Sequence, residues 1–304
     1  MGMLVVGSVA LDSITTPFGE KEEVLGGPAS HFSIAASYFT DVSLVAVVGE
    51  DFPEEHIAFF RRKGIDTSGL ERRPGKTFRW KGEYGSDLNA RAALETQLNV
   101  FADFSPKLLA VHRSQEYLFL CNIDPELQLS VLEQMKHPRM VACDTMNFWI
   151  TNKKEALLKT LARTDLLLIN DSEARQLAGE SNLILAARRI LAWGPKTLVI
   201  KRGECGALLF GACSIFSVPA FPVENVVDPT GAGDAFAGGM MGYLAASGAS
   251  DEAAMRKAVA FGTVMASLSV MNFGPQQLGD LTFPEIESRY REFRKITVFD
   301  EPAD

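Results

Sequence analysis

The residues best suited to chemistry lie in one short run, which reads Val-Asp-Pro-Thr-Gly-Ala-Gly-Asp-Ala-Phe-Ala-Gly-Gly from Val227 to Gly239. Gly231, Ala232 and Gly233 precede an apolar run of small residues, which predicts a tight turn that opens into a buried helix. The first N–H groups of a helix have no partner within the helix and carry the positive end of its dipole, and glycine lets a phosphate approach them closely. The run therefore predicts a phosphate-binding turn.

Asp234 follows this turn, at the point where those N–H groups converge. A carboxylate beside a bound phosphate is well placed to accept a proton from an attacking hydroxyl, so Asp234 is a candidate general base. Asp is also a common capping residue, and a simple helix cap is the alternative. The complete run favours the catalytic interpretation, because Asp228, Pro229 and Thr230 also fix the start of the turn.

These residues need a scaffold, and the chain supplies alternating strands and helices. Short apolar runs that suit buried strands occur at 4–7, 42–48, 117–121, 140–144, 165–169 and 197–200, with helix-compatible stretches among them. This order predicts a parallel sheet with helices on its faces. Ligands gather at the carboxyl ends of such strands, and Asp12 lies just past the first one, so it is a candidate for holding substrate hydroxyls or, alternatively, a turn residue.

The pattern changes between residues 66 and 104. Phe78, Trp80, Gly82 and Tyr84 alternate with polar or charged residues, which predicts a strand with one aromatic face. Such a face must be covered by the main body of the protein, by a partner subunit or by a bound substrate. An edge strand packed on the main body is the plain structural interpretation.

Composition disfavours several classes of function. The 304 residues carry a net charge of −8, which argues against nucleic acid or an anionic membrane as the main partner. No Cys-x-x-Cys or His-Glu-x-x-His motif occurs, so a cytoplasmic enzyme with reduced thiols is expected. Residues 1–7 read as a strand rather than a signal peptide. The longest apolar run, 235–246, contains glycines whose Gly-x-x-x-Gly spacing is typical of close helix packing rather than of a membrane span. The cysteines are Cys121, Cys143, Cys205 and Cys213.

The run at 227–239 resembles the C-terminal signature of the ribokinase-like, or PfkB-type, carbohydrate kinases, a family that includes nucleoside kinases such as adenosine kinase. The resemblance covers nearly the whole chain with its motifs in the right order. It implies an α/β fold, a ribokinase-like three-layer α/β/α sandwich, with residues 1–304 forming a single kinase domain. It also implies a small β-sheet lid inserted around 66–104, whose closure would exclude water and protect ATP from hydrolysis.

The resemblance also assigns an acceptor site. In the family an early Asp and a Gly-Gly pair followed by Asn bind sugar hydroxyls, and the residues that match here are Asp12, Gly26 and Gly27. The pattern departs at His31, which stands where Asn is usual. Histidine can still donate a hydrogen bond, so His31 stays a candidate for the substrate contact, with a histidine packed near the sheet as the alternative.

The resemblance also implies a site for ATP, the phosphoryl donor, and for Mg²⁺. Asn170 and Glu173 match the family's Asn-x-x-Glu motif, which positions Mg²⁺ and phosphate, often through water, although Asn and Glu at this spacing also form a helix-capping pair. The turn that touches ATP phosphates in the family matches a Gly-x-x-Gly here, with an ordinary hairpin as the alternative, and a lysine before it would add positive charge. An asparagine after the helix expected at 252–270 is a candidate for contact with the base or, equally, a helix-ending residue. Two residues of the signature run are candidates for a monovalent cation, as in some relatives. These candidates are Lys201, Gly203, Gly206 and Asn272 for ATP, and Asp228 and Thr230 for a cation such as K⁺.

Together these features predict an ATP-dependent kinase that transfers the γ-phosphoryl group to a primary hydroxyl of a sugar or nucleoside, with Mg²⁺ as cofactor. Asp234 would be the base, and the N–H groups of Ala232, Gly233 and Asp234 would stabilise the developing charge. The chemical class of the acceptor stays open between two alternatives. An aromatic lid face suits a nucleobase or an unphosphorylated sugar. A phosphorylated sugar would instead use the positive charges of Arg79, Lys81 and Arg91.

Two other classes of function compete with this hypothesis. A non-catalytic nucleotide or metabolite sensor would keep the fold, but the retained Asp234 and its glycines favour an enzyme. A dinucleotide-binding oxidoreductase is disfavoured, because no Gly-x-Gly-x-x-Gly motif follows the first strand. The expected partner is therefore a small molecule, and a homodimer formed through the lid is a further expectation. The sequence leaves the nucleotide preference open.

Overall fold

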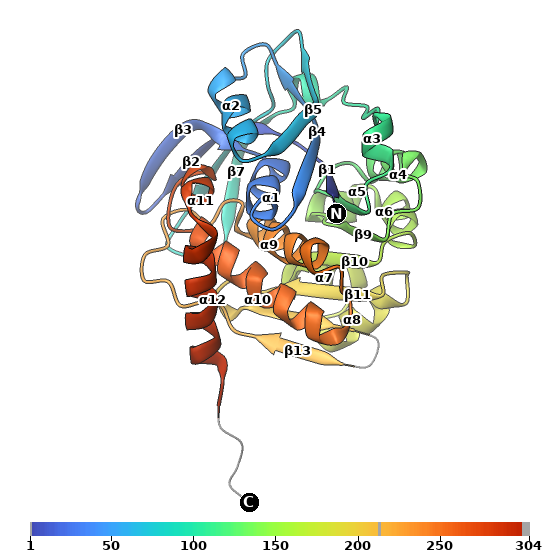
Figure 1. Cartoon of the computed structure of the whole chain (residues 1–304), viewed down its shortest axis with the longest axis vertical. Helices are drawn as coiled ribbons and strands as arrows, with labels where there is room; N and C mark the ends of the chain where they lie inside the picture. Colours follow the sequence, from blue (N-terminus) through green and yellow to red (C-terminus); the bar gives the residue numbers. More distant parts are fainter. Residues whose placement is uncertain (1, 212–213, 300–304) are drawn as a thin grey trace, which may run out of the picture.

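The computed structural model describes residues 2–211 and 214–299, and its framework is one large sheet. The strands of this sheet are β1 (Gly2–Val6), β4 (Asp41–Gly49), β5 (Ile65–Arg73), β8 (Tyr117–Leu120), β9 (Met140–Cys143), β10 (Leu166–Asn170), β11 (Thr197–Lys201), β12 (Ala207–Phe210) and β13 (Ile215–Val218). Within the described residues they lie in the order β13-β12-β11-β10-β9-β8-β1-β4-β5 (Figure 1). All neighbours from β5 to β11 pair in parallel, whereas β12 and β13 are antiparallel additions.

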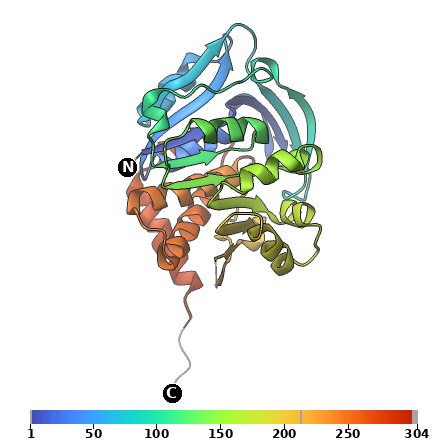
Figure 2. The same ribbon diagram turned by 90° about the vertical axis from the view of Figure 1, so that its right-hand side faces the viewer.

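Helices cover both faces of this sheet (Figure 2). Alternate residues of a strand point to opposite faces, and accordingly Met3 and Val5 join one hydrophobic cluster whereas Leu4 and Val6 join the other. The first cluster includes residues of α1 (Pro28–Ala36), α2 (Glu54–Arg62), α9 (Ala232–Ser247), α10 (Glu252–Ser269), α11 (Gln276–Asp280) and α12 (Phe283–Thr297). The second includes residues of α4 (Pro125–Gln134), α5 (Asn147–Asn152), α6 (Lys154–Leu161), α7 (Asp171–Ala178) and α8 (Leu183–Leu191), and the short α3 (Ala110–Arg113) precedes β8. The predicted three-layer α/β/α sandwich is confirmed.

A second, four-stranded sheet stands beside the main one (Figure 1). Its strands are β2 (Ala10–Thr16), β3 (Gly19–Gly26), β6 (Arg79–Tyr84) and β7 (Arg91–Gln97), in the order β3-β2-β6-β7. Along β6, Lys81 and Glu83 are exposed whereas Gly82 and Tyr84 are buried, which confirms the predicted two-faced strand. The covered face of this sheet therefore carries the aromatic residues.

The composition of this sheet differs from the insertion predicted at 66–104. β5, which begins inside that range, pairs with β4 in the main sheet, and half of the small sheet comes from residues 10–26. β5 is an edge strand with a largely polar, partly exposed sequence, and so lacks the apolar run of a central strand. β2 is buried on both faces, so its sequence shows no clear alternation. As a result Asp12 lies within β2 rather than in a turn after β1.

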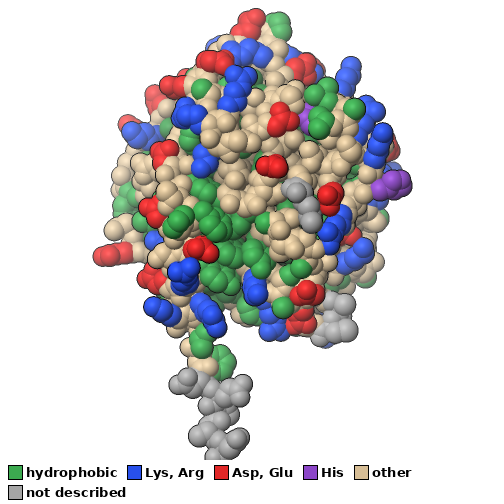
Figure 3. Space-filling model, in the orientation of Figure 1, with side chains coloured by type: hydrophobic (Ala, Val, Ile, Leu, Met, Phe, Trp, Pro, Cys, Tyr) green, Lys and Arg blue, Asp and Glu red, His purple; other side chains and the backbone are tan. Residues whose placement is uncertain are grey.

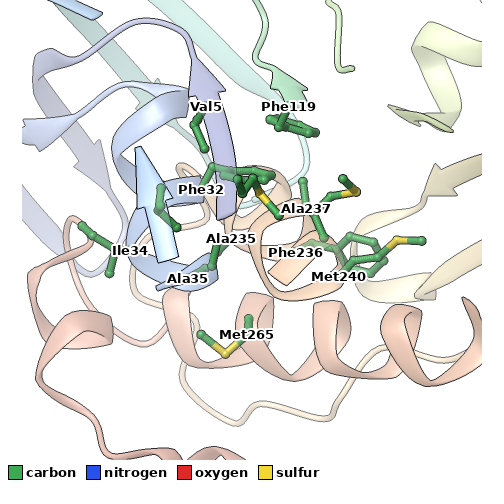
Figure 4. Packing of buried hydrophobic residues seen from close by; sticks show 14 of the residues in the cluster. Val5, Phe32, Ile34, Ala35, Phe119, Ala235, Phe236, Ala237, Met240 and Met265 are labelled. Carbon is green, nitrogen blue, oxygen red and sulfur yellow. The ribbon is translucent and has the colours of Figure 1, made fainter. Parts of the chain in front are cut away.

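The glycines of α9 set how closely the helices of the first layer approach (Figure 4). A Cβ at Gly238 would overlap the carbonyl oxygen of Phe32 on α1, and one at Gly239 would lie 2.5 Å from Cγ of Met265 on α10. Gly242 continues the α1 contact, with Cα of Ala36 3.1 Å from the position of its missing Cβ. The predicted role of the Gly-x-x-x-Gly spacing in close helix packing is thus confirmed.

The outer face of this layer carries a group of hydrophobic side chains (Figure 3). Hydrophobic side chains gather on the face formed by α10 and α12, where Phe261 stacks on Tyr243 and Tyr290. In the described part of the chain no helix is long and apolar enough to cross a membrane. Cys121, Cys143 and Cys205 carry free thiols, and Cys213 lies outside the described residues.

The packing of α9 on α1 gives a stability test. Gly238→Ala gains up to about 1 kcal/mol of helix propensity but forces a Cβ into backbone atoms of α1, which typically costs about 1–3 kcal/mol. We expect a net loss in the free energy of unfolding, measured by urea denaturation. The control is Gly85→Ala, since no atom lies within 4 Å of its added Cβ. Equal stability of the Gly238→Ala variant and the wild type would contradict the packing described here.

Candidate active site

Parallel strands bring their carboxyl ends to one edge of the main sheet, and polar or charged residues of three neighbouring strands meet there. Lys201 ends β11, Asn170 ends β10 directly opposite it, and Asp144 follows β9. The N-terminus of α9 lies against the same edge, because the missing Cβ of Gly233 would be 3.0 Å from Nζ of Lys201. The predicted phosphate-binding turn and the strand-end residues therefore form one site.

The turn itself has the geometry that its sequence predicts. Gly231 caps α9 with a φ of 73°, a left-handed conformation that favours glycine, and a Cβ there would also overlap the ring of His31. Asp228 is buried and accepts hydrogen bonds from the N–H groups of Thr230 at 2.8 Å and Gly274 at 3.4 Å. Burial raises the pKa of Asp228, although these hydrogen bonds oppose the shift. Asp228 thereby fastens the turn to the loop that follows α10.

Lys201 is the central positive charge of the site. Its Nζ donates a hydrogen bond to Oδ2 of Asp144 at 3.0 Å. Burial is the largest influence on the pKa of Lys201 and lowers it, but the carboxylates of Asp144, Glu173 and Asp234 together raise it, and the net shift is upward. Lys201 is consequently a buried ammonium close to three carboxylates, one of which is the predicted base.

Asn170 and Glu173 form the capping box that was the alternative to a magnesium site. Oδ1 of Asn170 accepts from the Glu173 N–H at 2.8 Å, and Oε2 of Glu173 accepts from the Asn170 N–H at 2.8 Å. The pair thus starts α7, and the Glu173 carboxylate helps to raise the pKa of Lys201. Within the described residues no group of three or more His, Cys, Asp or Glu side chains could hold a metal.

The predicted acceptor residues lie on the other side of the turn. Asp12 is buried, and its Oδ2 accepts from the N–H of Gly27 at 3.3 Å. Gly26 leaves room for this carboxylate, since a Cβ there would overlap it, and Gly27 has a φ of 85° before α1 begins. His31, in the first turn of α1, packs its ring on Gly231. The acceptor candidates and the signature turn are therefore adjacent.

His31 is a buried, neutral side chain. It is 2% exposed, and burial lowers its pKa to about 4. Its Nδ1 has no hydrogen-bond partner among the described protein atoms. A buried polar nitrogen without a partner is costly, and a ligand hydroxyl would satisfy it.

The Gly-x-x-Gly segment that is predicted to touch ATP phosphates forms a turn between β11 and β12. Gly203 and Gly206 both have positive φ, of 54° and 81°, around one turn of 3₁₀ helix, η2 (Gly203–Cys205). The small sheet reaches this turn, because a Cβ at Gly203 would overlap the side chain of Asn89 in the β6–β7 loop. Asn272 lies in the loop after α10, two residues before Gly274.

Sequence reasoning left two contacts out of the site. Asp144, like Asp12, is an acidic residue that follows an apolar strand in the sequence. Its ion pair with Lys201 crosses β10, and no pattern in the sequence indicates it. Tyr84 was assigned only to an aromatic face, yet its hydroxyl accepts a hydrogen bond from Oγ1 of Thr230 at 3.1 Å. The small sheet therefore contacts the signature turn directly.

The buried His31 should make stability depend on pH. Its pKa of about 4 in the folded protein lies below the usual histidine value of 6.5, so the unfolded chain binds the proton more tightly and stability falls as the pH drops from about 6.5 to 4. This gap corresponds to about 3 kcal/mol. Urea denaturation of His31→Asn across this range should show that much less pH dependence than the wild type. The exposed His137→Asn is the control, and identical pH profiles for His31→Asn and the wild type would contradict the burial of a neutral imidazole.

Comparison with known proteins identifies the family of this chain. The model of the pfkB family carbohydrate kinases matches residues 11–280. The cytidine kinase of Thermococcus kodakarensis is 33% identical over 258 residues, which cover 80% of this chain and 88% of that protein. The deoxyribokinase of Salmonella typhi is 30% identical over 321 residues, with 97% and 99% covered.

Solved structures share the fold. Aminoimidazole riboside kinase from Salmonella enterica, complexed with aminoimidazole riboside and an ATP analogue, superposes with a TM-score of 0.75 at 18% identity, over 95% of this chain and 100% of that one. The nucleoside kinase of Burkholderia thailandensis in complex with inosine gives 0.76 at 19% identity, with 95% and 98% covered. The chain belongs to the pfkB family of carbohydrate kinases, and it is a sugar or nucleoside kinase, a phosphotransferase with an alcohol group as acceptor.

Proposed function

We propose that this kinase transfers the γ-phosphoryl group of ATP to a primary hydroxyl of a nucleoside or an unphosphorylated sugar. The observation that carries the proposal is the position of the α9 N-terminus, which lies between Lys201 on one side and His31 on the other. Phosphate binds where the N–H groups and the ammonium converge, and the acceptor binds beside Asp12 and His31.

The charges of the small sheet favour an acceptor without a phosphate. Arg79 is already paired, with Glu23 at 2.6 Å and Asp51 at 2.7 Å. Lys81 is exposed on the face opposite Gly82 and Tyr84. Two of the positive charges that would hold a phosphorylated sugar are thus directed elsewhere. The cytidine kinase and the nucleoside complexes among the similar proteins support the same choice.

In the proposed reaction the acceptor hydroxyl oxygen attacks the γ-phosphorus in line with the bond to ADP. The new O–P bond forms while the bond to the β–γ bridging oxygen breaks, and ADP leaves with that electron pair. The hydroxyl proton passes to the carboxylate of Asp234. The N–H groups of Gly233 and Asp234 face the transferring oxygens and stabilise their charge, as the turn ending at Gly231 orients them. The Ala232 N–H, also expected to take part, already donates to the carbonyl oxygen of Pro229 at 3.2 Å.

The donor set at α7 fits a hydrated Mg²⁺. Asn170 and Glu173 supply one amide and one carboxylate, and each of their capping oxygens retains a lone pair beyond the hydrogen bond that it accepts. Mg²⁺ keeps several waters and is commonly held by one or two protein oxygens together with phosphates, so a pair of ligands rather than a cage suffices. When bound, the ion would neutralise charge on the phosphates of ATP.

The remaining candidates complete the ATP site in this proposal. Gly203 and Gly206 let the phosphates shared with ADP approach the η2 turn, and Asn272 contacts the base. Lys201 directs its charge at the γ-phosphate, beside Gly233. Asp228 and Thr230 provide oxygens near the turn for K⁺, although both already make hydrogen bonds.

The small sheet acts as a lid in this account. Two contacts support this role: the Tyr84 hydroxyl on Thr230, and Asn89 against Gly203. Both link the sheet to turns that border the ATP site, so the sheet is placed to exclude water when substrates are bound. A homodimer formed through this sheet belongs to the same proposal.

The test is ADP release from ATP and Mg²⁺ with nucleosides, free sugars and phosphosugars offered one at a time. We expect a nucleoside or free sugar to raise ADP release at least about tenfold over the rate without acceptor, and phosphosugars to have no such effect, because the lid cations are paired or face outward. EDTA should abolish turnover, and replacing KCl by tetramethylammonium chloride should lower it. If only a phosphosugar were turned over, the acceptor assignment would be overturned. If nucleotide bound but nothing were turned over, a sensor would be the better interpretation.

A further inference from the structure

Both side chains of the Lys201–Asp144 ion pair are largely removed from solvent, at 16% and 7% exposed. The pairs of Arg79 with Asp51 and of Lys196 with Asp165 are more open, with partners that are 30% and 80% exposed. Burying two charges costs several kcal/mol per ion, roughly, and the attraction between them seldom more than offsets this cost. Stability alone therefore gives little reason for this pair.

Asp144 is held in place independently of Lys201. Its Oδ1 accepts a hydrogen bond from the N–H of Thr145 at 2.7 Å. The fully buried Gln128 of α4 donates from Nε2 to the carbonyl oxygens of Cys121 at 2.9 Å and of Asp144 at 3.0 Å. The ends of β8 and β9 are thus tied together, and the Asp144 carboxylate has a fixed position at the sheet edge.

This fixed carboxylate directs Lys201 across the end of β10. Lys201 lies opposite Asn170 on β10, yet its Nζ reaches Asp144 beyond β9 and comes to rest beside Gly233. The ammonium therefore lies beside the first turn of α9, where the helix presents its first N–H groups. Those groups mark where the transferred phosphoryl group must lie if Asp234 is the base.

We propose that Lys201 is a catalytic residue that contacts the transferring phosphoryl group, and that Asp144 is the positioning residue that holds it there; the proposal rests on the kinase mechanism above. As the phosphoryl group moves from the β–γ bridging oxygen of ADP to the acceptor oxygen, charge on its equatorial oxygens is met by the Lys201 ammonium, which keeps its proton throughout. The acceptor proton goes to Asp234, so Lys201 gives and takes none.

The test uses aluminium fluoride, which forms a mimic of the transferring phosphoryl group beside bound ADP. Calorimetry measures the Kd of ADP with Mg²⁺, with and without the fluoride. We expect aluminium fluoride to tighten ADP binding to the wild type by about tenfold or more. Lys201→Met and Asp144→Asn should bind ADP alone within about threefold of the wild type but lose most of this tightening.

The matched control is Lys196→Met. Lys196 precedes the same strand β11 and pairs with Asp165 at 2.7 Å, but its side chain is 80% exposed and lies at the opposite edge of the sheet. This variant should keep the full tightening. If a single substitution at this pair prevents folding, the double variant Lys201→Met with Asp144→Asn removes both charges of the pair together, so it serves in the same test.

Turnover separates positioning by Asp144 from a structural role. With the acceptor that the wild type uses best, Asp144→Asn should lower kcat by about 10- to 100-fold while KM for ATP stays within about threefold. A structural residue would instead lower the melting temperature and leave kcat of the folded protein intact.

Three outcomes would overturn the proposal in distinguishable ways. If aluminium fluoride still tightened ADP binding to Lys201→Met, the ammonium would not contact the phosphoryl group, but the kinase mechanism would stand. Tightening absent from a wild type that binds ADP would place the phosphoryl group elsewhere than at Gly233. A wild type that does not bind ADP would overturn the kinase mechanism itself.

Discussion

The structure depends on the close approach of backbone and side chains at the first turn of α9. Gly231 has no room for a side chain because the His31 ring occupies that space, and the missing Cβ of Gly233 lies at contact distance from the Lys201 ammonium. Glycines further along α9 let the helix sit directly on α1 and α10, which fixes the direction of its N-terminus. The glycines of α9 thus have two effects: they let the helix pack closely in the core, and they leave its first N–H groups accessible to a ligand.

The charged groups at this turn favour an anion that binds together with a cation. Formally, the carboxylates of Asp144, Glu173 and Asp234 surround a single ammonium, so the site without ligands holds an excess of negative charge. ATP alone would be repelled by such a set, whereas ATP with Mg²⁺ brings its own neutralising charge. The N–H groups of α9 add attraction without adding a titratable group. The site therefore suits a nucleotide–metal complex better than free phosphate.

Much of this arrangement could be predicted from local patterns. The signature turn, the apolar strands that carry Asn170 and Lys201, and the Gly-x-x-x-Gly packing of α9 each leave a signal within a few residues of sequence. Two of the strands could not be recognised in the sequence. β5 is a polar edge strand and β2 is covered on both faces, so neither shows the alternation of polar and apolar residues that is expected of a strand. The pairing of Lys201 with Asp144 spans three strands and exists only in the folded sheet. The contact between Tyr84 and Thr230 likewise joins two separate sheets.

The central claim is that Asp234 takes the acceptor proton at the phosphate turn, and the most direct measurement compares Asp234→Asn with the wild type. The measurement is the single-turnover rate of ADP formation with the best acceptor, together with the affinity for ADP. Asparagine keeps the size of the side chain but cannot accept the proton, so the rate should fall by about 10²–10⁴-fold, with the ADP Kd within about threefold of the wild type. A rate within about tenfold of the wild type would contradict the assignment of the base and, with it, the mechanism built on this turn.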